Sequence, residues 1–171
     1  IDLALADEQS RLIQLDDEIT KAAATALLPF AELVTLLREL LEELGKIAGE
    51  FRALDVAVLG VSADTPARLQ KFREKLELPF TLLSDPMLTT AAALGVPVAT
   101  KANFVAVSVL HPTVRTYPKR SFLQPALFVW RRDGTLTHRW CQTESSLTNL
   151  YGARGRPRAD QVLQVVRKVL T

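Results

Sequence analysis

The chain has 171 residues, 48% of them hydrophobic and 23% charged, as expected of one globular domain with a full-sized core. Its formal net charge of +2 is too small to create a strong field that would recruit nucleic acid or a membrane surface. No apolar run approaches the roughly 20 residues of a membrane-spanning helix, and no signal-peptide pattern opens the sequence. We therefore expect a single soluble domain over residues 1–171.

Metal and disulfide chemistry have little support in the sequence. Cys141 is the one cysteine, so an internal disulfide is excluded. His111 and His138 lie far apart, and no residues with ligand spacing surround them. We predict no metal site and no cofactor.

The first 28 residues predict a hairpin followed by a strand. Apolar residues alternate with small or acidic ones over residues 1–6, a polar stretch follows, and residues 12–15 are largely apolar again. A short amphipathic helix is the alternative for this part. Residues 22–28 favour helix by propensity, but their place just before Pro29 and a leucine-rich helix favours a buried strand of small residues.

A βαβ unit is predicted next. From Pro29 onward, apolar side chains recur with the spacing of a helix that buries one face: Leu33, Leu36, Leu37, Leu40, Leu41, Leu44, Ile47 and Phe51. The unbroken apolar run 56–61 predicts a strand that is covered on both sides. Residues 62–66 end that strand and cap the next helix.

The rest of the chain predicts further alternation of helices and strands. Residues 67–76 show a helical repeat, 79–83 read as a short strand, and 88–94 as a small helix that ends at Gly95. Residues 96–122 contain three prolines and no clear period, so no element is assigned there. The turn Asp133-Gly134 joins the two strands of a hairpin, 126–130 and 135–140, and residues 160–170 form the closing helix.

Several spaced motifs resemble those of one family. They are 58–64 (VLGVSAD), 78–80 (LPF), 83–86 (LSDP), 94–96 (LGV) and the hairpin from Phe128 to Gly134. The chain is similar through these motifs to the peroxiredoxin-like (alkyl hydroperoxide reductase/thiol-specific antioxidant) family. The resemblance implies an α/β thioredoxin-like fold of the peroxiredoxin type: a central mixed β-sheet flanked by helices, with an N-terminal hairpin.

The same resemblance implies a catalytic motif, PxxxTxxC, which this chain does not keep. In the family, a thiolate at the first turn of a helix attacks a peroxide, a threonine orients the peroxide, and an arginine lowers the thiol pKa. Laid on Pro29, the motif puts the threonine at Leu33 and the cysteine at Leu36, and the arginine falls near Pro125.

A second register compares residues 28–31 with the CPFC motif of peroxiredoxin-like proteins, and again neither cysteine is present. Pro125 then matches the cis-proline that thioredoxin-type proteins place beside their active site. In either register the nucleophile is missing, so we expect these degenerate positions to be structural.

The remaining candidates have simpler interpretations. Cys141 falls just past the hairpin strand and away from a helix N-terminus, which predicts an inert, dispensable thiol. For Asp64, Asp85 and Glu39 we predict capping and surface solvation, and for Ser62 a structural turn. Basic clusters at 119–120, 131–132 and 154–158 are expected to be solvated loops: Lys119, Arg120, Arg131, Arg132, Arg154, Arg156 and Arg158.

Two function classes remain open. The first is a catalytically degenerate peroxiredoxin-like protein, not an enzyme, that acts as a structural or interaction subunit. The second is a thiol-dependent antioxidant oxidoreductase that reduces peroxide through Cys141 or a residue outside the observed chain. We expect a homodimer or membership of a larger assembly. The compartment stays open, cytoplasmic or organellar, since the chain starts with Ile1 and a leader is not excluded.

Overall fold

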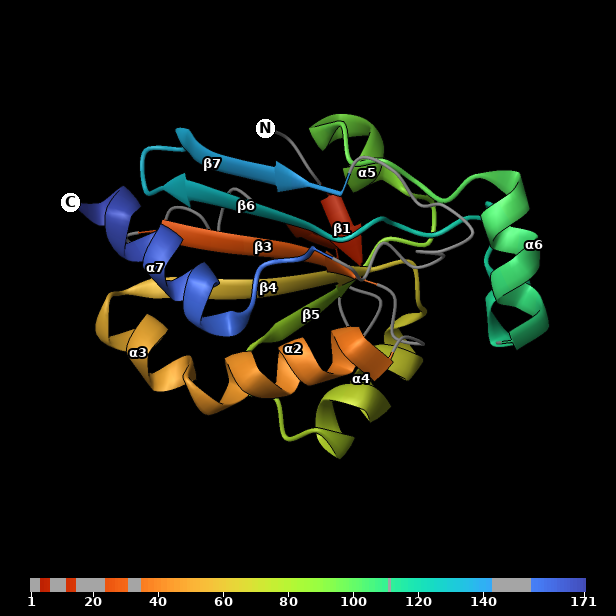
Figure 1. Ribbon diagram of the computed structural model, residues 1–171, viewed down its shortest axis with the longest axis horizontal. Helices are drawn as coiled ribbons and strands as arrows, with labels where there is room; N and C mark the ends of the chain where they lie inside the picture. Colours follow the sequence, from red (N-terminus) through yellow and green to blue (C-terminus); the bar gives the residue numbers. More distant parts are fainter. Residues whose placement is uncertain (1–3, 7–11, 15–23, 31–34, 111, 143–154) are drawn as a thin grey trace.

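The computed structural model describes residues 4–6, 12–14, 24–30, 35–110, 112–142 and 155–171 (Figure 1). Within them, one sheet has the strand order β2-β1-β5-β4-β3-β6-β7. The strands are β1 (Ala4–Ala6), β2 (Leu12–Gln14), β3 (Ala24–Phe30), β4 (Val56–Ser62), β5 (Thr81–Ser84), β6 (Ala126–Arg131) and β7 (Leu136–Cys141). The helices are α2 (Thr35–Lys46), α3 (Ala48–Ala53), α4 (Pro66–Lys75), α5 (Thr89–Leu94), α6 (Lys101–Leu110), the 3₁₀ helix η1 (Pro112–Thr116) and α7 (Ala159–Leu170).

The sheet is mixed, as predicted. β4 runs parallel to β3 and to β5, whereas β6 runs antiparallel to both of its neighbours, β3 and β7. The N-terminal hairpin is also confirmed, because β1 pairs with β2 antiparallel and joins the sheet beside β5.

Each face of the sheet carries its own hydrophobic core. Alternate residues of a strand point to opposite faces, so Val56 and Val58 of β4 face the cluster that holds α2, α3, α4 and α7, while Leu59 and Val61 face the other cluster. That second cluster contains α5, part of α6, and the segment before β6. The run 56–61 is therefore covered on both sides, as its sequence predicts.

The predicted start of the leucine-rich helix is wrong. Pro29 lies in β3, opposite Val61 of β4, and α2 begins only at Thr35. A proline has no N–H to donate to a neighbouring strand. The described pairing of β3 with β6 ends at Leu27, so Pro29 occupies a part of the strand that has a pairing neighbour on one side only.

The leucine-rich segment is also two helices rather than one. α2 ends at Lys46, and Ile47, with φ −103° and ψ 12°, separates it from α3. Glycines at 45 and 49 flank this break and weaken the helix locally. The break still leaves Phe51 of α3 buried in the same cluster as α2.

The segment 96–122, for which the sequence gives no element, contains α6 and η1. α6 stands at one end of the molecule (Figure 1). It has apolar residues on both of its faces: Phe104 and Val107 are buried, whereas Val105 and Val109 are exposed. A helix without a polar face gives no amphipathic period, which is why the sequence did not reveal it.

Candidate functional site

The carboxyl ends of the parallel strands meet at one edge of the sheet, where α/β folds bind ligands. Phe30 at the end of β3 is level with Ser62 of β4, which is level with Ser84 of β5. Pro125, which is buried, lies just before β6 on the other side of β3. The candidate site is therefore built from this edge and from the helix that follows β3.

The structure brings three of the four degenerate positions to this edge. Pro29 is in the last part of β3, Leu36 is the second residue of α2, and Pro125 precedes β6, its carbonyl accepting a hydrogen bond of 2.9 Å from the Gln142 backbone N–H. Leu33 lies outside the described residues. Leu36 thus occupies the first turn of a helix, the position that the PxxxTxxC register assigns to the cysteine.

The second register predicts a cis peptide bond before Pro125. The bond between Gln124 and Pro125 is trans, so this expectation is wrong. The Gln124 side chain is itself unusual: it is 1% exposed, and neither its Oε1 nor its Nε2 has a hydrogen-bond partner among the described residues.

Cys141 is the last residue of β7, opposite Ala126, and not a residue beyond the strand as predicted. It is partly buried, and it packs against the face of the sheet that α2 does not cover. Burial raises the pKa of the Cys141 thiol, and the neighbouring Arg139 offsets part of this rise. The thiol therefore has less thiolate character than its ordinary pKa would give.

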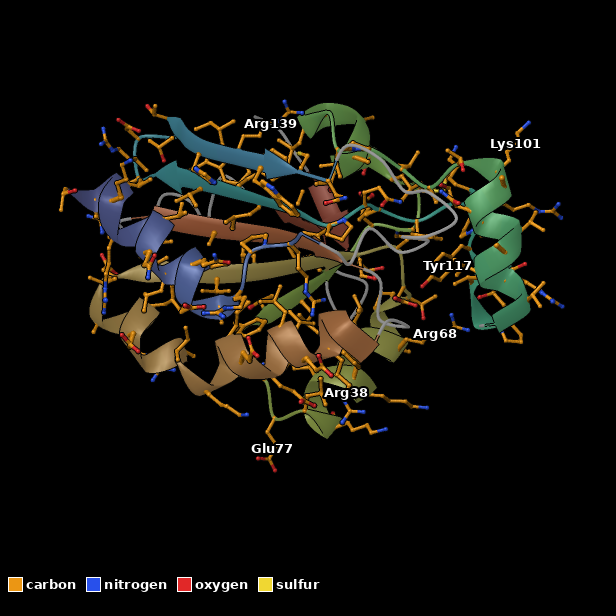
Figure 2. The ribbon with its side chains drawn as sticks, viewed as in Figure 1. Arg38, Arg68, Glu77, Lys101, Tyr117 and Arg139 are labelled. Carbon is orange, nitrogen blue, oxygen red and sulfur yellow. The ribbon has the colours of Figure 1, made fainter. Side chains whose placement is uncertain are left out.

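Arg139, two residues before the cysteine, binds the end of α5. Its Nη2 donates a hydrogen bond of 2.9 Å to the carbonyl oxygen of Gly95, and its guanidinium carbon lies 6.0 Å from the centre of the Phe128 ring (Figure 2). This arginine joins β7 to α5 and is part of the packing on that face.

A buried carboxylate lies at the same edge, where the sequence predicted surface solvation. Asp64 is 1% exposed, and its Oδ2 and Oδ1 accept hydrogen bonds of 2.7 Å each from the hydroxyls of Ser62 and Tyr117. Ser84 Oγ donates to the Asp64 backbone carbonyl at 2.6 Å, and Arg68 Nη1 lies 3.8 Å from Oδ1. Figure 2 shows Arg68 and Tyr117 at this end of the molecule. The prediction of a solvated Asp64 is wrong, and that of a structural role for Ser62 agrees with these contacts.

Asp85 caps α5, as predicted, but it is buried rather than solvated. Its Oδ1 accepts hydrogen bonds of 2.8 Å from the backbone N–H and the hydroxyl of Thr89, and its Oδ2 accepts one from the N–H of Thr90. Glu39 is exposed on α2. Both side chains have structural explanations and no reacting partner among the described residues.

In the described part of the chain, no three His, Cys, Asp or Glu side chains gather in a way that would hold a metal ion. None of the helices described is long and apolar enough to span a membrane. Among the described residues, the edge therefore offers a leucine, a proline and a hydrogen-bonded carboxylate, and no thiol.

Residues 1–139 match the sequence model of the AhpC/TSA family. The chain belongs to the AhpC/TSA family. A Haemophilus influenzae protein named "Putative peroxiredoxin bcp" is 51% identical over 47 residues, which are 28% of this chain and 30% of that protein. The match thus spans under a third of the curated relative.

Solved structures of several peroxiredoxins are similar to this AhpC/TSA chain over nearly its whole length. Peroxidoxin BcpB of Mycobacterium tuberculosis has a TM-score of 0.69 and 20% identity over 98% of this chain and 93% of that one. A mutant of peroxiredoxin 6 of Arenicola marina has a TM-score of 0.73 and 16% identity over 98% of this chain and 69% of that one. At these identities the likeness establishes the fold, which is the predicted thioredoxin-like, peroxiredoxin-type α/β fold.

Proposed function

We propose that this AhpC/TSA family member has lost thiol-based peroxide reduction and acts as a structural or interaction subunit. One observation carries the proposal: Leu36 occupies the first turn of α2, while Cys141, the one thiol of the sequence, packs on the opposite face of the sheet. A helix N-terminus stabilises a thiolate only within its first turn. Cys141 is instead the last residue of a strand, β7.

The chemistry of peroxide reduction supports the same conclusion. The first step needs a thiolate whose sulfur attacks one peroxide oxygen while the O–O bond breaks and the other oxygen leaves as an alkoxide or hydroxide. A leucine side chain has no lone pair to donate. The raised pKa of Cys141 leaves little thiolate at neutral pH, so this residue is a poor replacement.

The second candidate is a thiol-dependent reductase that uses Cys141. Two facts favour it: the thiol is partly accessible, and Arg139, two residues away, lowers its pKa in part. In this case one peroxide oxygen is transferred to the Cys141 thiolate, which gives a sulfenate and releases the other oxygen as an alcohol or water. One thiol of an external dithiol then attacks the sulfenic acid, forming a mixed disulfide and releasing water. The second thiol of the dithiol displaces Cys141 as a thiol, and the dithiol ends as a disulfide.

A peroxide-consumption assay with thioredoxin or glutathione as the reductant distinguishes the two. We expect the natural chain to be no faster than Cys141→Ser. In a Cys141→Ser background, Leu36→Cys should gain slow turnover, because the new thiol lies at the helix N-terminus. Val105→Cys, an exposed position in the middle of α6, is the matched control and should gain none. A robust natural activity that Cys141→Ser abolishes would contradict the proposal and support the second candidate.

A further inference from the structure

An apolar ridge runs along the outer side of α6. Ala102, Val105 and Val109 lie on one helix face, at i, i+3 and i+7, and all three are exposed. The exposed fractions of Val105 and Val109 are 61% and 67%, and Val98, just before the helix, is 42% exposed. We call these four residues the α6 ridge.

The opposite side of α6 is already used by the fold. Phe104 and Val107 are buried in the core cluster, and η1 packs beside the helix. A helix that is apolar on all sides is normally buried on all sides. The ridge is therefore apolar surface that the described part of the chain leaves uncovered, at an extremity of the molecule where a large partner can reach it (Figure 1).

Positive charges lie at both ends of this helix. Lys101 opens α6 and points away from the body of the molecule (Figure 2). Ser121 Oγ donates a hydrogen bond of 3.0 Å to the Ala99 carbonyl, which brings the exposed residues Lys119 and Arg120 next to the same end. Arg115 Nε donates to the Ser108 carbonyl at 3.0 Å and so lies near the other end.

The stretch of sequence that carries α6 has no acidic residue of its own. Residues 86–130, the stretch that contains α6, have two lysines and two arginines but no aspartate or glutamate. The net charge of +2, which argues against a membrane partner when it is averaged over the chain, therefore hides a basic region around α6. The side chains of Lys101, Lys119 and Arg120 form no hydrogen bond or ion pair with the described residues, so their charges are available.

We propose that the α6 ridge and its flanking cations dock on an anionic lipid surface, with α6 lying in the plane of the membrane interface. Apolar side chains on one helix face, surrounded by lysines and arginines, are what binds peripheral helices to such surfaces. A second copy of this chain fits less well, because pairing two ridges would bring two basic regions together without any carboxylate from either segment. The inference is independent of whether the protein reduces peroxide.

Vesicle co-sedimentation of the full chain tests the proposal. We expect binding to vesicles of phosphatidylcholine mixed with phosphatidylglycerol, and little binding to phosphatidylcholine alone. Binding should weaken as salt is added, since salt screens exposed charges. The double variants Val105→Asp/Val109→Asp and Lys119→Glu/Arg120→Glu should each weaken binding by on the order of tenfold or more.

Matched variants away from α6 provide the controls. Leu136→Asp changes an apolar residue, 41% exposed, in the β6–β7 hairpin, and Lys46→Glu/Lys168→Glu reverses two exposed cations on α2 and α7. Both should bind like the natural chain, with all variants showing unaltered thermal unfolding. Absence of binding to anionic vesicles overturns the proposal, as does equal binding by the ridge variants. Sedimentation equilibrium without lipid tests for a dimer. If the natural chain is a dimer and Val105→Asp/Val109→Asp is a monomer, the α6 ridge binds a second copy of the chain instead of a membrane, and the proposal is overturned.

Discussion

The hydroxyl of Tyr117, which directly follows η1, donates a hydrogen bond of 2.7 Å to Oδ1 of Asp64, 53 positions earlier in the chain. Both residues are buried. This bond joins the end of β4 to the segment that carries α6, at the edge of the sheet where the parallel strands end. A buried carboxylate is tolerated only when its oxygens are hydrogen-bonded, so the contact is part of what holds this edge together.

Removing the hydroxyl should therefore cost stability. Tyr117→Phe keeps the ring and loses the donor to a buried charged group, and we expect the free energy of unfolding to fall by about 1.5–3 kcal/mol. Urea unfolding measures this loss. Thr116→Val is the control: Thr116 Oγ1 accepts a bond of 3.2 Å from Arg68 Nη1 at an exposed site, and the change should cost less than about 0.5 kcal/mol. Equal losses in the two variants would contradict the role given to Asp64.

Two glycines should respond to alanine in opposite directions. Gly95 ends α5 with φ +63°, and a Cβ placed there would lie 3.1 Å from Arg139 Nη2. Gly95→Ala should destabilise the protein by about 1–2 kcal/mol, because the left-handed conformation strains any Cβ. Gly49 lies inside α3 with nothing within 4 Å of a new Cβ, so Gly49→Ala should stabilise by about 0.5–1 kcal/mol. Thermal unfolding of both variants checks the signs, and a stabilising Gly95→Ala would refute the strain.

Position along the chain predicted the strands better than local propensity did. The alanine-rich segment before Pro29 favours helix by propensity, yet β3 is central, held by pairing with β4 and β6. Tertiary pairing outweighs a preference of a few tenths of a kcal/mol per residue. The sequence did not predict α6, because its exposed valines remove the alternation of apolar and polar faces that marks a helix at the surface.

The site was predictable only in part. The leucine at position 36 and the single cysteine are read directly from the sequence. The burial of Asp64 is not, because its partner Tyr117 lies in the segment without a period, and only the fold brings the two together. The sequence also could not predict the sheet face on which Cys141 packs, because that face depends on the register of β7 against β6.

The raised pKa of Cys141 predicts slow reaction with alkylating reagents near neutral pH. Thiolate is the reacting form, and burial disfavours it, so the rate of iodoacetamide labelling should rise with a midpoint pH above that of the urea-unfolded chain. Arg139→Gln should move the midpoint further up, since the arginine lowers the thiol pKa. A midpoint below that of the unfolded chain would contradict the inert interpretation.

His138 on β7 should make the protein sensitive to mild acid. Partial burial lowers its pKa, so the unfolded chain, with a histidine pKa of about 6.5, binds the proton first as the pH falls. The contribution of neutral His138 to the free energy of unfolding is therefore fully present above about pH 6.5, and it is lost as the pH falls through the lowered pKa of the folded protein. His138→Gln should flatten this part of the profile in urea unfolding measured against pH. If His138→Gln leaves the slope of the unfolding free energy against pH unchanged, groups other than His138 cause the acid sensitivity.

Replacing the buried amide of Gln124 should not destabilise the protein. Both of its polar atoms lack partners among the described residues, and the side chain is 1% exposed. Such a group carries a desolvation cost of about 1–3 kcal/mol, which Gln124→Leu removes at similar volume, so we expect an unchanged or higher free energy of unfolding. Ser84→Ala, which removes a buried hydroxyl that does have a partner, should lower it by about 0.5–1.5 kcal/mol. If Gln124→Leu is the more damaging change in urea unfolding, the amide binds a water or ligand at this edge.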